Sequence, residues 1–119
     1  MGSQLQKIYR NTAVSSTALL VETGSNLLVG WNLININTTN CFLKVYNAAA
    51  AVDVTVGTTT PLETLLIPAS GCHILSNEDM FQIGCSLGMV IAVTTGMLDN
   101  SSAAPSTACY VKLLYSDRQ

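Results

Sequence analysis

Charge is scarce in this sequence. Only 10% of the 119 residues are charged, against about 25% in an average soluble domain, so Thr, Ser and Asn must supply most of the surface polarity. The five basic residues are scattered along the chain. Nucleic-acid binding needs clustered cations that displace counterions from phosphates, and a membrane-surface helix needs a basic stripe. The sequence therefore predicts neither a nucleic-acid partner nor a membrane partner.

Long apolar runs are missing as well. No segment approaches the roughly 18 uninterrupted apolar residues of a membrane span, and residues 1–16 lack the apolar run of a secretory signal. We therefore expect a soluble protein made in a cytoplasm. Hydrophobic residues nevertheless make up 49% of the chain. This combination favours a surface partly covered by other subunits, with a small neutral domain around a large core as the alternative.

Groups for catalysis are few. His73 is the only histidine and lies in an apolar run, where a lone histidine is usually structural. The adjacent Cys72 should point to the opposite face of a strand, which argues against a Cys/His pair. The sequence contains no Gly-x-Ser-x-Gly elbow and no phosphate-binding glycine loop. We predict that the protein is not an enzyme and has no cofactor or small-molecule substrate.

The cysteines and acidic residues show no metal-binding pattern. No Cys-x-x-Cys pair occurs, and each cysteine is predicted to be a small buried hydrophobe, with a disulfide left open. The four are Cys41, Cys72, Cys85 and Cys109. Glu78 and Asp79 are adjacent, unlike the alternating ligands of a calcium loop, so we interpret them as solvated turn residues. We predict no metal site.

Aromatic residues make up only 6% of the chain. Carbohydrate-binding sandwiches often expose aromatic platforms, but Trp31 lies in the middle of an apolar run and is predicted to belong to the core. Asn37 and Asn100 begin Asn-x-Ser/Thr glycosylation patterns. Without a secretion signal, we interpret both as turn chemistry.

Short β-forming runs dominate what the sequence does contain. In the last run Val111, Leu113 and Tyr115 share one face, and Tyr110, Lys112 and Leu114 share the other. Residues 47–52, with four consecutive alanines, could form a helical turn or a tight crossing. The predicted strands are residues 18–23, 27–36, 41–46, 54–56, 62–67, 72–75, 81–85, 89–95 and 109–115.

The spacing of these runs predicts an all-β, antiparallel β-sandwich of jelly-roll-like type, because no long crossover helix separates the strands. Residues 17–119 form the predicted sandwich domain. Residues 1–16 are polar without a clear period and are predicted to be an extended N-terminal arm. Residues 96–107 are predicted to be a long polar loop.

Several segments resemble small β-sandwich virion proteins of tailed bacteriophages, in particular capsid decoration (cement) proteins. The resemblance covers residues 41–115 and lies in the order of its motifs. These are CFLKVYN at 41–47, VGTTTP at 56–61, LLIPA at 65–69, IAVTTG at 91–96 and VKLLY at 111–115. The resemblance implies a non-enzymatic protein on the capsid surface of a virion, made in the host cytoplasm.

The partners implied are the chain itself, as a homotrimer or homodimer, and the major capsid protein. A decoration protein stabilises adjacent capsid subunits through many weak contacts that add by multivalency. We expect partner contacts from Leu5, Ile8, Tyr9 and Arg10. The alternative is a tail-fibre or other virion component with a receptor- or carbohydrate-binding sandwich.

Overall fold

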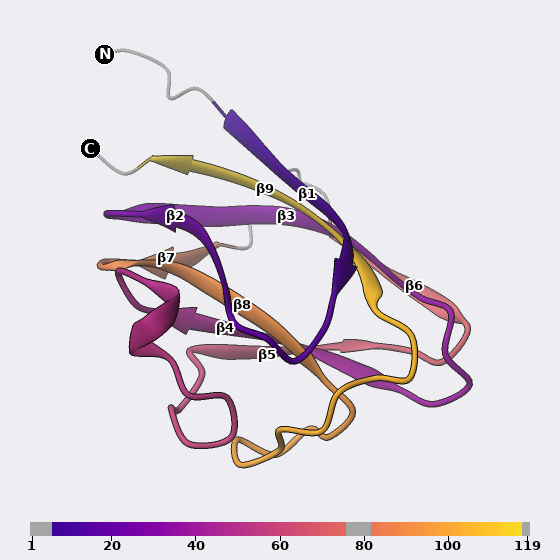
Figure 1. The fold of residues 1–119 in the computed structure, drawn as a ribbon. Coiled ribbons are helices and arrows are strands. Elements are labelled where there is room, and N and C mark those ends of the chain that lie inside the picture. The colour runs from indigo at the N-terminus through magenta and orange to yellow at the C-terminus, as the bar shows by residue number, and fades with distance from the viewer. Residues whose placement is uncertain (1–5, 76–81, 118–119) are drawn as a thin grey trace.

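The short Val-, Ile-, Leu- and Thr-rich runs form two antiparallel sheets that pack face to face in the computed structural model (Figure 1). The structure describes residues 6–75 and 82–117. Sheet A contains β1 (Gln6–Val14), β9 (Cys109–Asp117), β3 (Asn26–Asn35) and β6 (Gly71–Leu75) in that order, with β7 (Ile83–Cys85) also paired to β3. Sheet B contains β2 (Leu19–Thr23), β8 (Gly88–Thr94), β4 (Cys41–Asn47) and β5 (Glu63–Ile67) in that order.

The order of the strands is that of a jelly roll. Along the chain, β1 to β4 alternate between sheets A and B, β5 stays in sheet B, β6 and β7 lie in sheet A, and β8 and β9 again take one sheet each. β6 pairs with residues 31–35 of β3 and β7 with residues 26–28. These two short strands therefore share one strand position at the edge of sheet A. Two packed antiparallel sheets of four positions are the jelly-roll arrangement, so the predicted sandwich is confirmed.

One core fills the space between the sheets, because side chains on a strand alternate between its two faces. Leu33 of sheet A and Leu43 of sheet B are fully buried in it. Trp31 belongs to the same core and is only 5% exposed, as predicted from its place within a strand. Cys41, Cys85 and Cys109 are also buried in this core, which agrees with their predicted role as small hydrophobes.

The predicted N-terminal arm is wrong for residues 6–14. This segment is strand β1, which pairs antiparallel with β9 along its length. Val14 is fully buried, and Tyr9 packs against the core. Polar side chains such as Lys7 occupy inward positions of this edge strand, so the apolar alternation of a strand is weak in the sequence. The predicted boundary after residue 16 is therefore not the edge of the sandwich.

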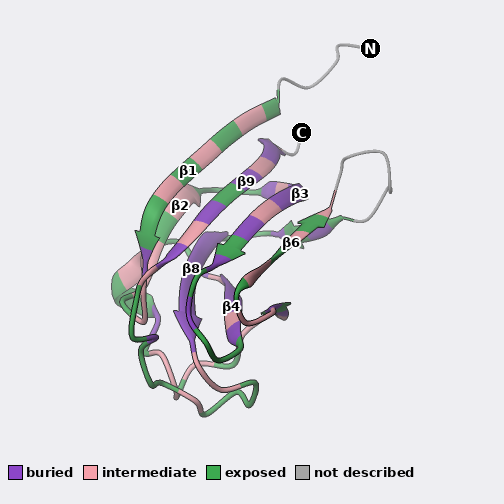
Figure 2. Cartoon of the chain, turned by 90° about the vertical axis from the view of Figure 1, so that its right-hand side faces the viewer, coloured by how far each residue is buried: buried purple, intermediate pink, exposed green. Residues whose placement is uncertain are grey.

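The outer face of sheet B is covered by the chain's own loops. All seven residues of β8 are buried (Figure 2). Loop 48–62 and loop 95–108 approach each other closely, since a Cβ on Gly57 would lie 2.9 Å from the Cβ of Ser102. A second apolar cluster lies beneath this cover and contains Tyr46, Ala48, Val54, Val90 and Ala92.

The alanine-rich stretch contributes one turn of 3-10 helix, η1 (Ala51–Asp53). The turn includes only the last of the four alanines, so most of residues 47–52 is not helical. The edge strand predicted at residues 54–56 is a loop. Within residues 6–75 and 82–117, no helix has the length and apolar character needed to cross a membrane.

Candidate protein–protein interface

The four residues predicted to contact a partner divide between the two faces of β1. Ile8 is 61% exposed, and Arg10 is also exposed, with its guanidinium 5.5 Å from the centre of the Tyr110 ring. Tyr9 faces the core instead. Leu5 lies outside the described residues. The structure therefore leaves Ile8 and Arg10 as surface residues of sheet A.

The outward side of sheet A, here called face A, is a broad surface assembled by strand register. β1, β9 and β3 place Ile8, Leu114 and Gly30 in one row. The next row contains Arg10, Lys112, Asn32 and Ile74, and the third contains Tyr110, Ile34 and Cys72. Loops cover the outer face of sheet B, but Ile8, Ile34 and Ile74 on face A are exposed.

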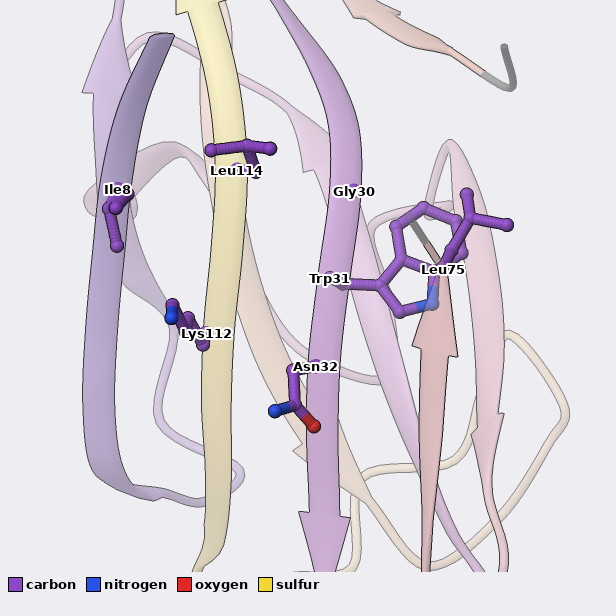
Figure 3. A pocket seen from close by; sticks show the side chains of 7 residues that line it. All are labelled: Ile8, Gly30, Trp31, Asn32, Leu75, Lys112 and Leu114. Atoms are coloured by element: carbon purple, nitrogen blue, oxygen red, sulfur yellow. The ribbon is translucent and has the colours of Figure 1, made fainter. Parts of the chain in front are cut away.

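A hollow of about 270 Å³ opens on face A at Gly30. Figure 3 shows the bare backbone of Gly30 between Leu114 on one side and Leu75 on the other. No Cβ fills this position, and the lining is mostly apolar. A hollow of this kind on a sheet surface can accept apolar side chains from another protein.

The charges of face A are all positive among the described residues. Arg10 and Lys112 lie directly opposite each other on β1 and β9. Like charges in this position repel one another. The register of the described strands and the alternation of side chains along them show which residues of sheet A point outward. None of these outward residues in the described strands is acidic. An acidic group from a partner would therefore be attracted to this face.

The opposite side of the sandwich presents an apolar projection, here called the tip, formed by Met97, Leu98 and Asp99 of loop 95–108. Met97 and Leu98 are 62% and 63% exposed, and Asp99 is also exposed. The loop was predicted to be polar from its Ser, Ala, Asn and Asp content, and this prediction missed the tip. The adjacent Met97 and Leu98 were the signal in the sequence.

A buried lysine holds the tip in place. Lys44 points to the outer face of sheet B, and its Nζ donates hydrogen bonds to the carbonyl oxygens of Met97 and Leu98 at 2.7 and 2.8 Å. Burial lowers the pKa of Lys44, and the nearby Asp99 carboxylate offsets part of this effect. Because burying an ammonium group is costly unless it is paired, the lysine fixes this loop against sheet B.

Among the described residues, the structure places two of the groups considered for chemistry in the sequence, His73 and Cys72, on opposite faces of β6. His73 Nδ1 lies 2.8 Å from the carbonyl oxygen of Leu66, and its ring makes an edge contact with Trp31 at 5.6 Å. Cys72 is exposed on face A, so its predicted burial is wrong, and it does not pair with the inward His73. Within the described residues, no three His, Cys, Asp or Glu side chains form a metal-binding group. Glu78 and Asp79 lie outside the described residues.

Asn37, the first residue of one glycosylation pattern, is only 7% exposed. Its side chain exchanges two hydrogen bonds of 2.8 Å with the backbone of Thr107. It also donates to Asn35 Oδ1 at 2.8 Å. This network ties the turn after β3 to the start of β9, as expected of turn chemistry.

Comparisons with known proteins assign no family to the chain. No family model matches it, and no curated protein matches it. A chain from a solved structure of Bacillus endospore appendages, described as a novel family of disulfide-linked pili, is similar at 15% sequence identity and a TM-score of 0.47. The alignment covers 98% of this chain and 88% of that chain. A likeness at this level carries no argument about function.

Proposed function

We propose that this chain is a non-enzymatic structural protein of a virion, a capsid decoration protein that binds the outer shell and stabilises adjacent major capsid subunits. The observation that carries the proposal is face A. It is a sheet surface with exposed Ile8, Ile34 and Ile74 and an apolar hollow. The loops of the chain cover the outer face of sheet B but not face A. Face A is therefore available for contact with another protein.

The edges of the sandwich favour contact through faces over addition of strands. β1 is interrupted by a bulge between Asn11 and Val14, and β2 by a bulge between Leu20 and Glu22. Bulges and charged side chains protect edges against pairing with another chain. The irregular edges at β1 and β2 are therefore less suited to strand addition, which favours association through a face of the sandwich.

A decoration protein repeats the same contact at many symmetry-related positions. A modest apolar contact at each position is then sufficient for stable attachment, because the binding free energies of many contacts add over the shell. The cations Arg10 and Lys112 of face A, on the edge strand β1 and its neighbour β9, add electrostatic selection for an acidic partner surface. The order of the motifs at residues 41–115 supports the same class of protein.

The test is co-sedimentation of the purified chain with capsid shells of the phage that encodes it, stripped of accessory proteins. We expect saturable binding at a fixed ratio to the major capsid protein, and shells that resist heat and chelators better after binding. Absence of binding to the shells contradicts the proposal. Binding to a glycan array in place of the shells would assign the chain to the tail-fibre alternative.

A further inference from the structure

We propose that face A receives a second copy of this chain, docked head to tail, with the tip of one copy seated in the hollow of the next. The inference rests on the proposed function as a building block of a shell and names the partner of face A. The tip and the hollow lie on opposite sides of the sandwich, since Lys44 holds the tip over the outer face of sheet B.

Charge complementarity selects this occupant. The cations of face A, Arg10 and Lys112, have no acidic partner on their own face among the described residues. Asp99 follows the exposed apolar pair of the tip, and Asp53 follows Val52, which is 89% exposed on the same side of the molecule. The Lys44 ammonium beneath the tip is buried and hydrogen-bonded, so the exposed charges of this side are Asp53 and Asp99, which attract the cations of face A in a head-to-tail orientation.

The hollow also fits the tip in size and polarity. A cavity of about 150 Å³ can hold a benzene molecule, so the hollow of about 270 Å³ at Gly30 has room for the Met97 or Leu98 side chain. Asn32 lines the same hollow, and its Oδ1 atom is buried without a hydrogen-bond partner in the described structure. Because that oxygen is shielded from solvent, the Asn32 amide must rotate before an N–H group of a docked chain can bind it, and the fit rests on the size and apolar lining of the hollow.

The tip is already ordered before docking, which lowers the entropy lost on association. In addition to the two bonds from Lys44, Ser101 N donates to Leu98 O at 3.0 Å, and Thr94 Oγ1 donates to Gly96 O at 2.9 Å. Two exposed apolar side chains are thus held on a fixed backbone. A rigid apolar projection of this kind is a suitable anchor for a pocket on a partner.

Contacts between two different surfaces of the same chain are heterologous. They close into a ring, such as a trimer, when the rotation between copies returns to the first copy, and they otherwise continue as an open stack. A contact of face A with face A would instead be isologous and end at a dimer. The two arrangements give different results when complementary variants are mixed.

The experiment uses Ile8→Asn, which makes the lining of the hollow more polar without adding a cation to face A, and Leu98→Lys, which blocks the tip. Both positions are exposed in the single chain, so both variants should fold. Leu87→Lys is a matched control, because Leu87 is exposed in the turn between β7 and β8 and belongs to neither surface. Sedimentation velocity measures the mass of each protein alone and of an equimolar mixture of the first two.

We expect the wild type and Leu87→Lys to associate with increasing concentration. Each blocked variant alone should associate at least about tenfold more weakly, a loss of about 1.4 kcal/mol or more. The mixture should form a one-to-one pair that grows no further, because only one intact tip and one intact hollow meet. A Leu98→Lys protein that still dimerises alone, or a wild type that stays monomeric, overturns the inference. A monomeric chain that still binds capsid shells overturns this inference alone and leaves the proposed function standing.

Discussion

At the scale of single residues, Lys44 joins the outer face of sheet B to the tip, which is one of the two proposed contact surfaces. Lys44→Met keeps much of the apolar stem but removes the hydrogen bonds of Nζ to the carbonyl groups of Met97 and Leu98, of which Leu98 retains its bond from Ser101 N. We expect the free energy of unfolding to fall by about 2 kcal/mol, as measured by urea denaturation. Lys112→Met is the control, because Lys112 is exposed and its loss should change stability by less than about 0.5 kcal/mol. Equal effects of the two substitutions would contradict the anchoring role of Lys44.

The buried thiol of Cys85 predicts a loss of stability at alkaline pH. Burial raises the pKa of Cys85 from 9.0 to about 11, so the unfolded chain releases this proton at lower pH than the folded chain. The stabilisation is complete below pH 9 and disappears as pH rises towards 11, a change of up to about 3 kcal/mol. Lys44 acts in the opposite sense, because its pKa is lowered on folding.

The contribution of Cys85 is isolated by comparing variants. Urea denaturation under reducing conditions, at about pH 8 and about pH 10.5, gives the change in unfolding free energy for each protein. We expect this change to be smaller in Cys85→Ala than in the wild type. Cys72→Ala, which alters an exposed thiol, is the control and should behave like the wild type. Identical pH dependence in all three proteins would show that Cys85 does not contribute.

At the scale of elements, β1 is the strand whose role changed between sequence and structure. If β1 is part of the sandwich, Val14→Ala should lower the free energy of unfolding by about 2 kcal/mol, because Val14 is fully buried and its truncation leaves a cavity. Ile8→Ala on the outward side should cost less than about 0.5 kcal/mol. Urea denaturation of both variants measures the difference. A negligible effect at Val14 would return β1 to the status of an arm.

The central strands were predictable from the sequence because each is either a run of mostly apolar residues or an alternation of two faces with different chemistry. Thus β4 and β9 were placed within two residues of their observed bounds, and Lys112 and Leu114 were correctly assigned to one face. Which face is outward depends on the packing of the two sheets, which local periodicity does not contain. β1 was missed because an edge strand needs fewer apolar residues than a central one. The hollow at Gly30 is lined by residues of four strands, β1, β3, β6 and β9, which are distant in sequence, so no local sequence pattern predicts it.

At the scale of the whole molecule, the two outer surfaces of the sandwich are unequal. Sheet B carries its own apolar cover, whereas face A keeps exposed isoleucines and a hollow. The exposed charges of these two surfaces follow the same division, with Arg10 and Lys112 on face A and Asp53 and Asp99 on the loops over sheet B, where the cation Lys44 is buried beneath the tip. Because the two outer surfaces differ, subunits that associate through them all point the same way along the assembly.

The central claim is that another protein covers face A in the assembled particle. The thiol of Cys72 reports directly on whether face A is accessible to solvent. Cys72 is exposed on face A, whereas Cys41, Cys85 and Cys109 are buried. The measurement is the rate of maleimide labelling of Cys72 in the dilute free chain and in the chain assembled on capsid shells, with Cys72→Ser as the control for labelling elsewhere. The account predicts one fast-reacting thiol in the free chain and labelling slowed by at least about tenfold after assembly. An unchanged rate in assembled particles would mean that face A stays open to solvent and would contradict the account.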